Sequence, residues 1–261
     1  MPYSWIQILW FFLIYAFLGW CSEVVFAAVH RGVFVNRGFL NGPVCPIYGF
    51  GVTGIAVALY PVASNTALLF LGSVLLTSFI EWLTGFVLEK IFHQKWWDYS
   101  ERPFNVKGYI CLEFSLLWGL AGVFVIRVVH APIAALTQKL PFRLSVILLC
   151  VLYAIFLADF LLTLIELLKL PKKIRAMQET EKQLNALSEK IGGKLSDTAI
   201  RLKEKSGEVR EKWDQSETKE ELEKKKQRLE KKYRALSEKK SFTHRRILKA
   251  FPNLTDRLRK K

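Results

Sequence analysis

Cysteine is scarce in this sequence, and its spacing excludes two common kinds of site. The four cysteines, Cys21, Cys45, Cys111 and Cys150, lie in or at the ends of apolar runs, and no two of them form a C-x-x-C pair. Disulfide frameworks and zinc sites depend on such patterned spacing. We therefore interpret these cysteines as small buried hydrophobic residues and predict no metal or cofactor.

The sequence also lacks the phosphate-binding motif of ATPases, G-x-x-x-x-G-K-[ST]. The nearest stretch, IGGKLS at 191–196, has neither the spacing nor a Ser or Thr directly after Lys194. Any ATPase would therefore be a separate chain. No nucleophile–base motif stands out either, so the sequence favours a protein without catalytic residues that is not an enzyme.

The first 170 residues have little net charge, only +2. Residues 172–261 hold 28 of the 38 Lys and Arg and 15 of the 23 Asp and Glu, a net charge of +13. The composition thus divides near Pro171. We predict two domains, a polytopic transmembrane domain at 1–170 and a basic cytoplasmic helical tail at 171–261.

Long apolar runs dominate the first part, and a helix needs about 20 mostly apolar residues to cross a membrane. The predicted spans are Trp5–Val29, Val44–Tyr60, Ala67–Ile91, Ile110–Val129 and Leu144–Leu168. Backbone groups inside a bilayer must be satisfied internally, so these spans are helices. The predicted fold class is an all-α integral membrane protein with about five transmembrane helices and a charged helical or coiled-coil tail.

The distribution of Lys and Arg predicts the orientation, because these residues gather in cytoplasmic loops. The basic loop residues that share a side with the tail are Arg31, Arg37, Lys90, Lys95, Arg102 and Lys107. The loop from Arg127 to Arg143 is an exception, because it is basic and would lie outside. The tail carries many more basic residues, so we base the orientation on the tail. We predict a multi-pass protein of the plasma membrane with its N-terminus outside and its C-terminal tail in the cytoplasm.

The first four spans show a weak internal repeat. A shift of 66 positions aligns Gly19 and Glu23 with Gly85 and Glu89, and it also aligns Gly42 and Cys45 with Gly108 and Cys111. Both copies consist of a helix, a basic loop rich in Gly and Pro, and a second helix. This pattern indicates a duplicated two-helix hairpin, followed by one further helix.

Six carboxylates lie within or near the ends of the spans: Glu23, Glu81, Glu89, Glu113, Asp159 and Glu166. One ionised carboxylate near the bilayer centre costs about 2.5–3.5 kcal/mol, so these groups should face inward and find partners. Arg31, Arg37, Arg102 and Lys107 in the loops are the candidates. Two interpretations stay open: the pairs hold helices together, or they line a polar cavity that opens to the cytoplasm.

Two loops between the spans combine polar residues with Gly and Pro. In FVNRGFLNGPVCPIYGFG (34–51), Pro43 and Pro46 limit helix formation, which favours a re-entrant or partly unwound start to the second span. In WWDYSERPFNVKGYICLEF (96–114), Trp96, Trp97 and Tyr99 suit the membrane interface, but Asp98, Arg102 and Asn105 need another explanation. We expect this loop to fold against the bundle.

Both loops closely resemble those of a bacterial family, the CmpB-type ABC transporter permeases, over roughly Trp5 to Val129. The resemblance implies a multispan membrane protein, with permease as the family label. The positions that look like the family's motifs are Glu23, Asn36, Arg37, Gly38, Asn41, Gly42, Pro43, Pro46, Tyr48, Gly49, Trp97, Asp98, Tyr99, Pro103, Asn105 and Gly108. The predicted substrate-binding set is Glu23, Asn36, Arg37, Asn41, Tyr48, Glu81, Glu89, Asp98, Arg102, Asn105, Glu113 and Asp159.

The tail has two patterns that suggest partners. Leu222, Leu229 and Leu236 are spaced by sevens, which predicts either a short coiled coil that could form a homo-oligomer or a single solvated helix. The pair Gly192–Gly193 should break the preceding helix. The last 18 residues place Ile247, Leu248, Phe251, Leu254 and Leu258 among basic residues, which favours anionic lipid headgroups over nucleic acid.

Three functions follow from these patterns. The favoured one is transport, in which the carboxylates and loop arginines bind a polar or ionic solute. The second is a membrane-embedded enzyme that acts on lipid headgroups, with Glu23 or Glu81 as general base. The third is a membrane-anchored scaffold that recruits partners through its coiled-coil tail.

Overall fold

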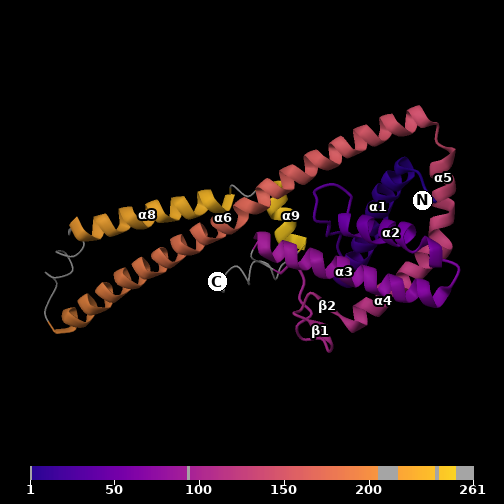
Figure 1. Ribbon diagram of the computed structural model, residues 1–261. Coiled ribbons are helices and arrows are strands. Elements are labelled where there is room, and N and C mark those ends of the chain that lie inside the picture. Colours follow the sequence, from indigo (N-terminus) through magenta and orange to yellow (C-terminus); the bar gives the residue numbers. More distant parts are fainter. Residues whose placement is uncertain (1, 93–94, 205–216, 239–240, 251–261) are drawn as a thin grey trace. The chain divides into compact units, whose positions relative to one another are not determined.

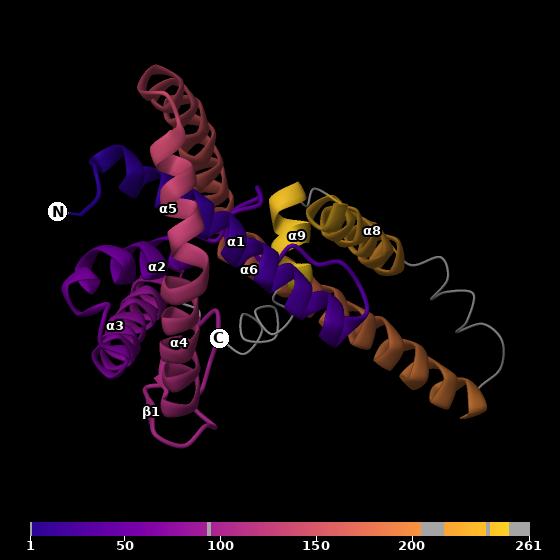
Figure 2. The same ribbon diagram turned by 90° about the vertical axis from the view of Figure 1, so that its right-hand side faces the viewer.

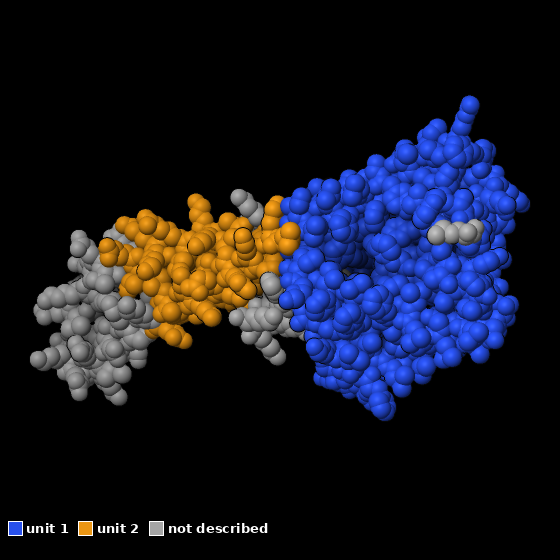
Figure 3. Space-filling view, in the orientation of Figure 1, with its two compact units in different colours: residues 1–167, 243–257 blue, residues 168–242, 258–261 orange. Residues whose placement is uncertain are grey.

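The computed structural model describes residues 2–92, 95–204, 217–238 and 241–250 (Figure 1). The described chain is mainly helical, which confirms the predicted fold class. It divides into two compact units, coloured separately in Figure 3. Unit 1 comprises Met1–Leu167 and a stretch that begins at Thr243, and unit 2 is built from Leu168–Phe242.

Helices α1 (Trp5–Arg31) and α2 (Pro46–Ala58) form the first antiparallel pair of unit 1. Small residues let the two helices approach closely. Gly19 of α1 faces the side chain of Tyr48, and Gly49 of α2 lies against the backbone of α1. A Cβ atom at either glycine would overlap its neighbour.

The predicted second span, Val44–Tyr60, is only partly helical. Its helix α2 has 13 residues and is therefore about 20 Å long, too short to cross a membrane alone. The loop before it instead descends into the bundle, where the N–H of Cys45 donates a 2.9 Å hydrogen bond to the carbonyl oxygen of Ala16, near the middle of α1. The irregular start that Pro43 and Pro46 predict is thus present, and the loop and α2 share one crossing.

Helix α3 (Thr66–Phe92) pairs with α4 (Leu112–Phe124) in a second hairpin, after the short 3-10 helix η1 (Tyr60–Val62). This pairing again uses glycine, because Gly122 of α4 lies directly against the side chain of Ser73. α2 and α4 each have 13 residues, begin 66 positions apart and follow a buried cysteine. These features agree with the predicted repeat.

The predicted outside loop from Arg127 to Arg143 is helical for most of its length, which corrects that expectation. A π-helical turn, η2 (Val125–Val129), continues α4 into α5 (His130–Lys139). The wider turn lets the helix change register without ending. Within the described residues, Leu112–Lys139 is one of four helical stretches long and apolar enough to cross a membrane; the others begin at Trp5, Thr66 and Phe142.

Helix α6 (Phe142–Glu204) begins in unit 1, where it packs along α1. The indole N–H of Trp10 donates a 2.6 Å hydrogen bond to the hydroxyl of Ser145, and the hydroxyl of Tyr153 donates to a carbonyl of α1. In the same contact, Phe12 of α1 stacks on Tyr153 and meets Phe156 edge to face. These bonds join the fifth apolar helix to the first hairpin.

The chain of unit 2 continues α6 and then forms α8 (Glu217–Glu238), which lies beside the second half of α6 in both views (Figures 1 and 2). The helix was predicted to break at Gly192–Gly193, but α6 continues through these residues and through Pro171. Each glycine costs only about 1 kcal/mol in a helix, and the helix-forming residues around the pair outweigh this cost. Leu222, Leu229 and Leu236 are partly buried, whereas self-association through them stays a prediction.

Candidate functional site

The first loop is fastened to α6 through Asp159. Carboxylate oxygen Oδ1 accepts hydrogen bonds from the backbone and side-chain nitrogens of Asn41, at 3.2 and 3.0 Å, and Oδ2 accepts one of 2.7 Å from the backbone of Gly42. The hydroxyl of Thr163 donates a further bond to Oδ1. A membrane-embedded carboxylate with this many donors is well satisfied, although these donors are not the loop Arg and Lys side chains expected as partners.

Asn36 gives the loop its internal shape. Its side-chain oxygen accepts hydrogen bonds from the indole of Trp20 and the backbone N–H of Gly38, and its side-chain nitrogen donates to the carbonyl of Asn41. The three predicted site residues Asn36, Asn41 and Asp159 therefore belong to one hydrogen-bonded cluster. This cluster holds irregular backbone against α1 and α6, and its polar groups satisfy one another.

Arg246 of helix α9 (Phe242–Ala250) completes this cluster from the far end of the chain. Its guanidinium donates hydrogen bonds of 2.6 Å to the carbonyl of Gly38 and 2.8 Å to that of Phe39, and its Nε donates to the side-chain oxygen of Asn41 at 3.2 Å. Burial lowers the pKa of Arg246 to about 10, which Asp159 partly offsets, so the group stays charged at neutral pH.

The rest of α9 packs tightly within unit 1. Ile247 is fully buried, and Ala250 forms a small apolar cluster with Ala27 and Val35. The imidazole of His244 lies 2.7 Å from the carbonyl oxygen of Glu166. Ile247 therefore faces protein, although the sequence assigned it to a lipid surface; Phe251, Leu254 and Leu258 lie outside the described residues.

Glu23, Arg37 and Tyr48 form a second cluster at the junction of α1, the first loop and α2. The hydroxyl of Tyr48 donates a 2.7 Å hydrogen bond to Oε1 of Glu23, and Nη1 of Arg37 lies 3.5 Å from Oε2. The guanidinium also lies over the ring of Phe26. Glu23 and Arg37 are each about one quarter exposed, so this pair is partly accessible.

Glu81 lies on α3 and is 8% exposed. The hydroxyl of Tyr99 donates a long hydrogen bond of 3.3 Å to its Oε1, and Oε2 has no hydrogen-bond partner in the described part of the chain. Burial and then the charge of Glu81 raise the pKa of Tyr99, and Glu23 contributes in the same direction. Both carboxylates therefore act on the same phenol.

The second loop folds into a hairpin whose strands are β1 (Asn105–Val106) and β2 (Ile110–Cys111). The side chain of Asn105 bonds the backbone on both sides of its turn, so its role is to shape the hairpin. The indole of Trp97 and the hydroxyl of Tyr109 tie the hairpin together and to Glu89. The loop thus folds against the bundle, as expected.

The remaining predicted site residues, Asp98, Arg102 and Glu113, bond to partners other than the residues of the Asp159 and Glu23 clusters. Asp98 accepts hydrogen bonds from Ser100 and lies 3.7 Å from Lys95. Arg102 and Glu113 form a 3.0 Å ion pair in which both side chains are more than half exposed. Sequence reasoning missed Arg246 altogether, because no periodicity or motif links the end of the chain to the first loop.

Long apolar helices and inward-facing carboxylates define a polytopic helical membrane protein. Residues 10–164 match the model of the family described as "Putative ABC-transporter type IV", and the chain belongs to this family. This confirms the predicted resemblance and gives the protein a membrane transport-related role. No curated protein and no solved structure is significantly similar to the chain.

Proposed function

We propose that this protein is a membrane-embedded transport component whose solute site lies between Glu23 and Glu81. The buried Oε2 of Glu81 supports this proposal most directly, because it has no hydrogen-bond partner among the described residues. Retaining an ionised carboxylate in such a place costs about 2.5–3.5 kcal/mol, and the single long hydrogen bond from Tyr99 offsets only part of this cost. A bound solute would supply the missing partner.

The chemistry of the site favours a solute with positive charge. The site presents the carboxylates of Glu23 and Glu81 and the hydroxyls of Tyr48 and Tyr99, against the single guanidinium of Arg37. Two carboxylates opposite one guanidinium leave a net negative site when both are ionised. A monovalent cation or a protonated amine would balance this charge.

Each hairpin contributes one Tyr–Glu pair to the site, which suggests how it could open. Tyr48 and Glu23 belong to the first hairpin, whereas Glu81 lies on α3 of the second and Tyr99 in its loop. We propose that the hairpins move relative to each other around the carboxylates. The basic loops favour access from the cytoplasm, with the N-terminus outside.

A separate ATPase chain would supply the energy, since this sequence has no phosphate-binding motif. We propose that the present chain is not itself an enzyme. Anionic headgroups remain candidate partners for the exposed Arg245 and Lys249 of α9. These two charges lie on the side of α9 that unit 1 leaves uncovered.

Charge displacement on a solid-supported membrane tests the solute site. Proteoliposomes with the full chain would be exposed to steps of potassium, methylammonium, choline and putrescine, which detects binding without ATP. We expect a current with at least one cation that Glu81→Gln abolishes and that Glu101→Gln, at an exposed position outside the predicted site, retains. The absence of any current in the wild type, or an equal current in Glu81→Gln, would contradict the proposal.

A further inference from the structure

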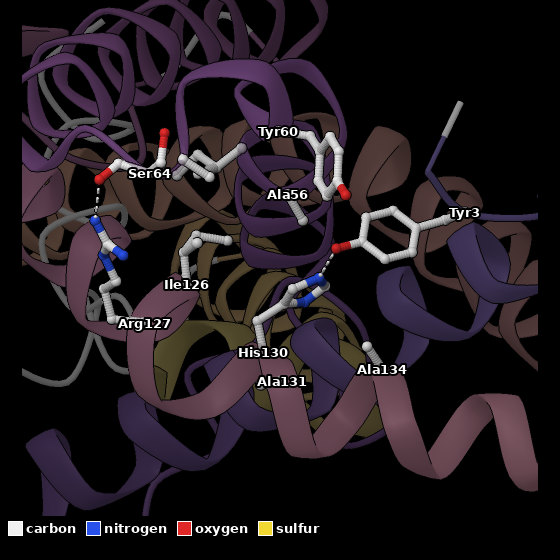
Figure 4. A pocket seen from close by; sticks show the side chains of 11 residues that line it. Tyr3, Ala56, Tyr60, Ser64, Ile126, Arg127, His130, Ala131 and Ala134 are labelled. Carbon is white, nitrogen blue, oxygen red and sulfur yellow. Dashed lines mark hydrogen bonds between the residues drawn. The ribbon is translucent and has the colours of Figure 1, made fainter.

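A cavity of about 360 Å³ lies at the end of unit 1 where α1 begins, far along α3 from Glu81 (Figure 4). It is partly open to the surface, and it is lined by Tyr3, by residues from α2 to the turn after η1, and by the junction of η2 and α5. Ligand pockets commonly measure about 300–1,000 Å³.

The walls of the cavity are mainly apolar, with polar groups at two sides. Four alanines and two isoleucines line it, among them Ala56 and Ile126. In Figure 4, Arg127 and Ser64 lie on one side of these apolar residues, and Tyr3, Tyr60 and His130 lie on the other. The cavity thus suits an amphipathic ligand.

The π-helical turn η2 directs three residues of one helix into the cavity. In an α-helix, steps of four residues rotate by about 40° each, so Ile126, His130 and Ala134 would drift around the axis. The wider turn at Val125–Val129 offsets this drift, and all three residues line the cavity. Such turns occur often at functional sites.

The hydrogen bonds of His130 determine which neighbouring groups remain available to donate a hydrogen bond to a ligand. Its Nδ1 lies 2.6 Å from the hydroxyl of Tyr15, and its Nε2 lies 2.8 Å from that of Tyr3. Tyr15 is only 2% exposed and has no other partner in the described chain, so it should donate to Nδ1. A neutral His130 then donates to the oxygen of Tyr3, whose own O–H is free to point at a ligand.

Arg127 supplies a second set of donors. Its Nη2 donates to the carbonyl of Ser64 at 2.9 Å and to the hydroxyl of Thr66 at 3.0 Å, which fixes the guanidinium at the rim. Its other N–H groups have no partner among the described residues. No Asp or Glu from the described chain lines the cavity, so cationic and O–H donors face no competing carboxylate.

From these observations we propose that the cavity binds an anionic amphiphile. The anionic group lies against Arg127, a second acceptor receives the O–H of Tyr3, and the apolar body packs on the alanines. This ligand could be a membrane phospholipid or a free organic anion with an apolar chain. The proposal does not depend on the carboxylate site on the other part of α3.

Binding to the full chain in a non-ionic detergent tests the proposal. The probes are dihexanoyl phosphatidylglycerol, octanoate and, as a neutral control, dihexanoyl phosphatidylcholine, with thermal unfolding and native mass spectrometry as readouts. We expect saturable binding of at least one anionic probe. Arg127→Gln should weaken this binding at least about tenfold, the loss of one charge-assisted contact, whereas Arg143→Gln should not change it.

Two further variants separate a site from a general charge effect. Ala131→Leu fills the cavity and should abolish binding with Arg127 still present, whereas Tyr3→Phe should weaken it. Preference for the glycerophospholipid identifies a lipid site, and preference for octanoate identifies a site for a free anion. Equal binding of the neutral lipid, or unchanged binding in both Arg127→Gln and a folded Ala131→Leu, would overturn the proposal.

Discussion

Arg246 donates a 2.6 Å hydrogen bond to the carbonyl oxygen of Gly38, although 208 positions separate the two residues. The contact joins the end of the chain to the loop that enters the bundle beside α1. Because the same guanidinium also holds Phe39 and Asn41, one side chain fixes most of the loop. Asp159 holds the opposite side of that loop.

Replacing Arg246 should release both α9 and the first loop. Arg246→Ala leaves three backbone carbonyls and the Asn41 side-chain oxygen without this donor, and each loss of a buried partner costs about 1–3 kcal/mol. Hydrogen exchange should therefore rise at Val35–Val44 and at Phe242–Ala250. Arg245→Ala is the matched control, since Arg245 is exposed on the same helix. Equal protection from hydrogen exchange in the two variants would show that Arg246 does not hold the first loop and α9 in place.

Asp159 should matter more for stability than its position in an apolar helix suggests. Asp159→Asn replaces one acceptor oxygen by an NH2 group that faces the donors of Asn41 and Gly42. Bonds to charged groups contribute about 1.5–3 kcal/mol each, so we expect a lower midpoint of thermal unfolding. Thr163→Val removes one donor to Asp159 and the acceptor of a bond from Asn41, but it leaves the carboxylate and its bonds from Asn41 and Gly42 in place, so it should lower the midpoint less. The reverse order would show that the charge of Asp159 is unimportant.

Two glycines of α2 should respond to alanine with opposite signs. A Cβ at Gly49 would lie 2.7 Å from the carbonyl oxygen of Phe12, whereas a Cβ at Gly51 meets nothing within 4 Å. Gly49→Ala should therefore destabilise the protein by about 1–3 kcal/mol through overpacking. Gly51→Ala should stabilise it by about 0.5–1 kcal/mol through helix propensity. Thermal unfolding of the purified protein in detergent measures both, and equal shifts would exclude close packing as the cause.

Of the two Arg–Glu pairs, the more buried one should have the larger coupling energy, although its two charged groups are farther apart. Arg37 and Glu23 are 3.5 Å apart with side chains 25% exposed, whereas Arg102 and Glu113 are 3.0 Å apart but more than half exposed. Exposed pairs contribute about 0.2–1 kcal/mol. Double-mutant cycles with Gln at all four positions should give the larger coupling energy for Arg37 and Glu23. A larger coupling energy for Arg102 and Glu113 would mean that the shorter distance between the charged groups contributes more than burial does.

The long helices could be predicted from the sequence because apolar length is a strong local signal. The predicted spans Trp5–Val29 and Ala67–Ile91 differ from α1 and α3 by no more than two residues at either end. The irregular chain before α2 was also predictable, since proline removes a backbone donor at a known position. The extent of α4 and α5 was not, because Arg127 and Lys139 gave a loop-like charge pattern inside a continuing helix.

The candidate site was predictable in residue type but only partly in pairing. Because intramembrane carboxylates must find partners, four basic loop residues were candidates, and two of them, Arg37 and Arg102, do pair with Glu23 and Glu113. Which carboxylate each would meet was not predicted. The contacts of Asp159 with backbone N–H groups could not be foreseen, because every residue offers that donor. Arg246 lies among many basic residues, and only the fold distinguishes it from them.

Because α9 packs within unit 1, truncating the chain before α9 would remove part of unit 1 as well as unit 2. Both ends of Leu168–Phe242 connect to unit 1, so unit 2 is an insertion in the membrane domain rather than an appendage. A protein cut after Leu170 would lose Arg246 and Ile247 from the bundle along with the soluble helices. Deleting only Leu168–Phe242 and joining the flanking residues with a linker would instead leave α9 and its Arg246 in contact with the first loop.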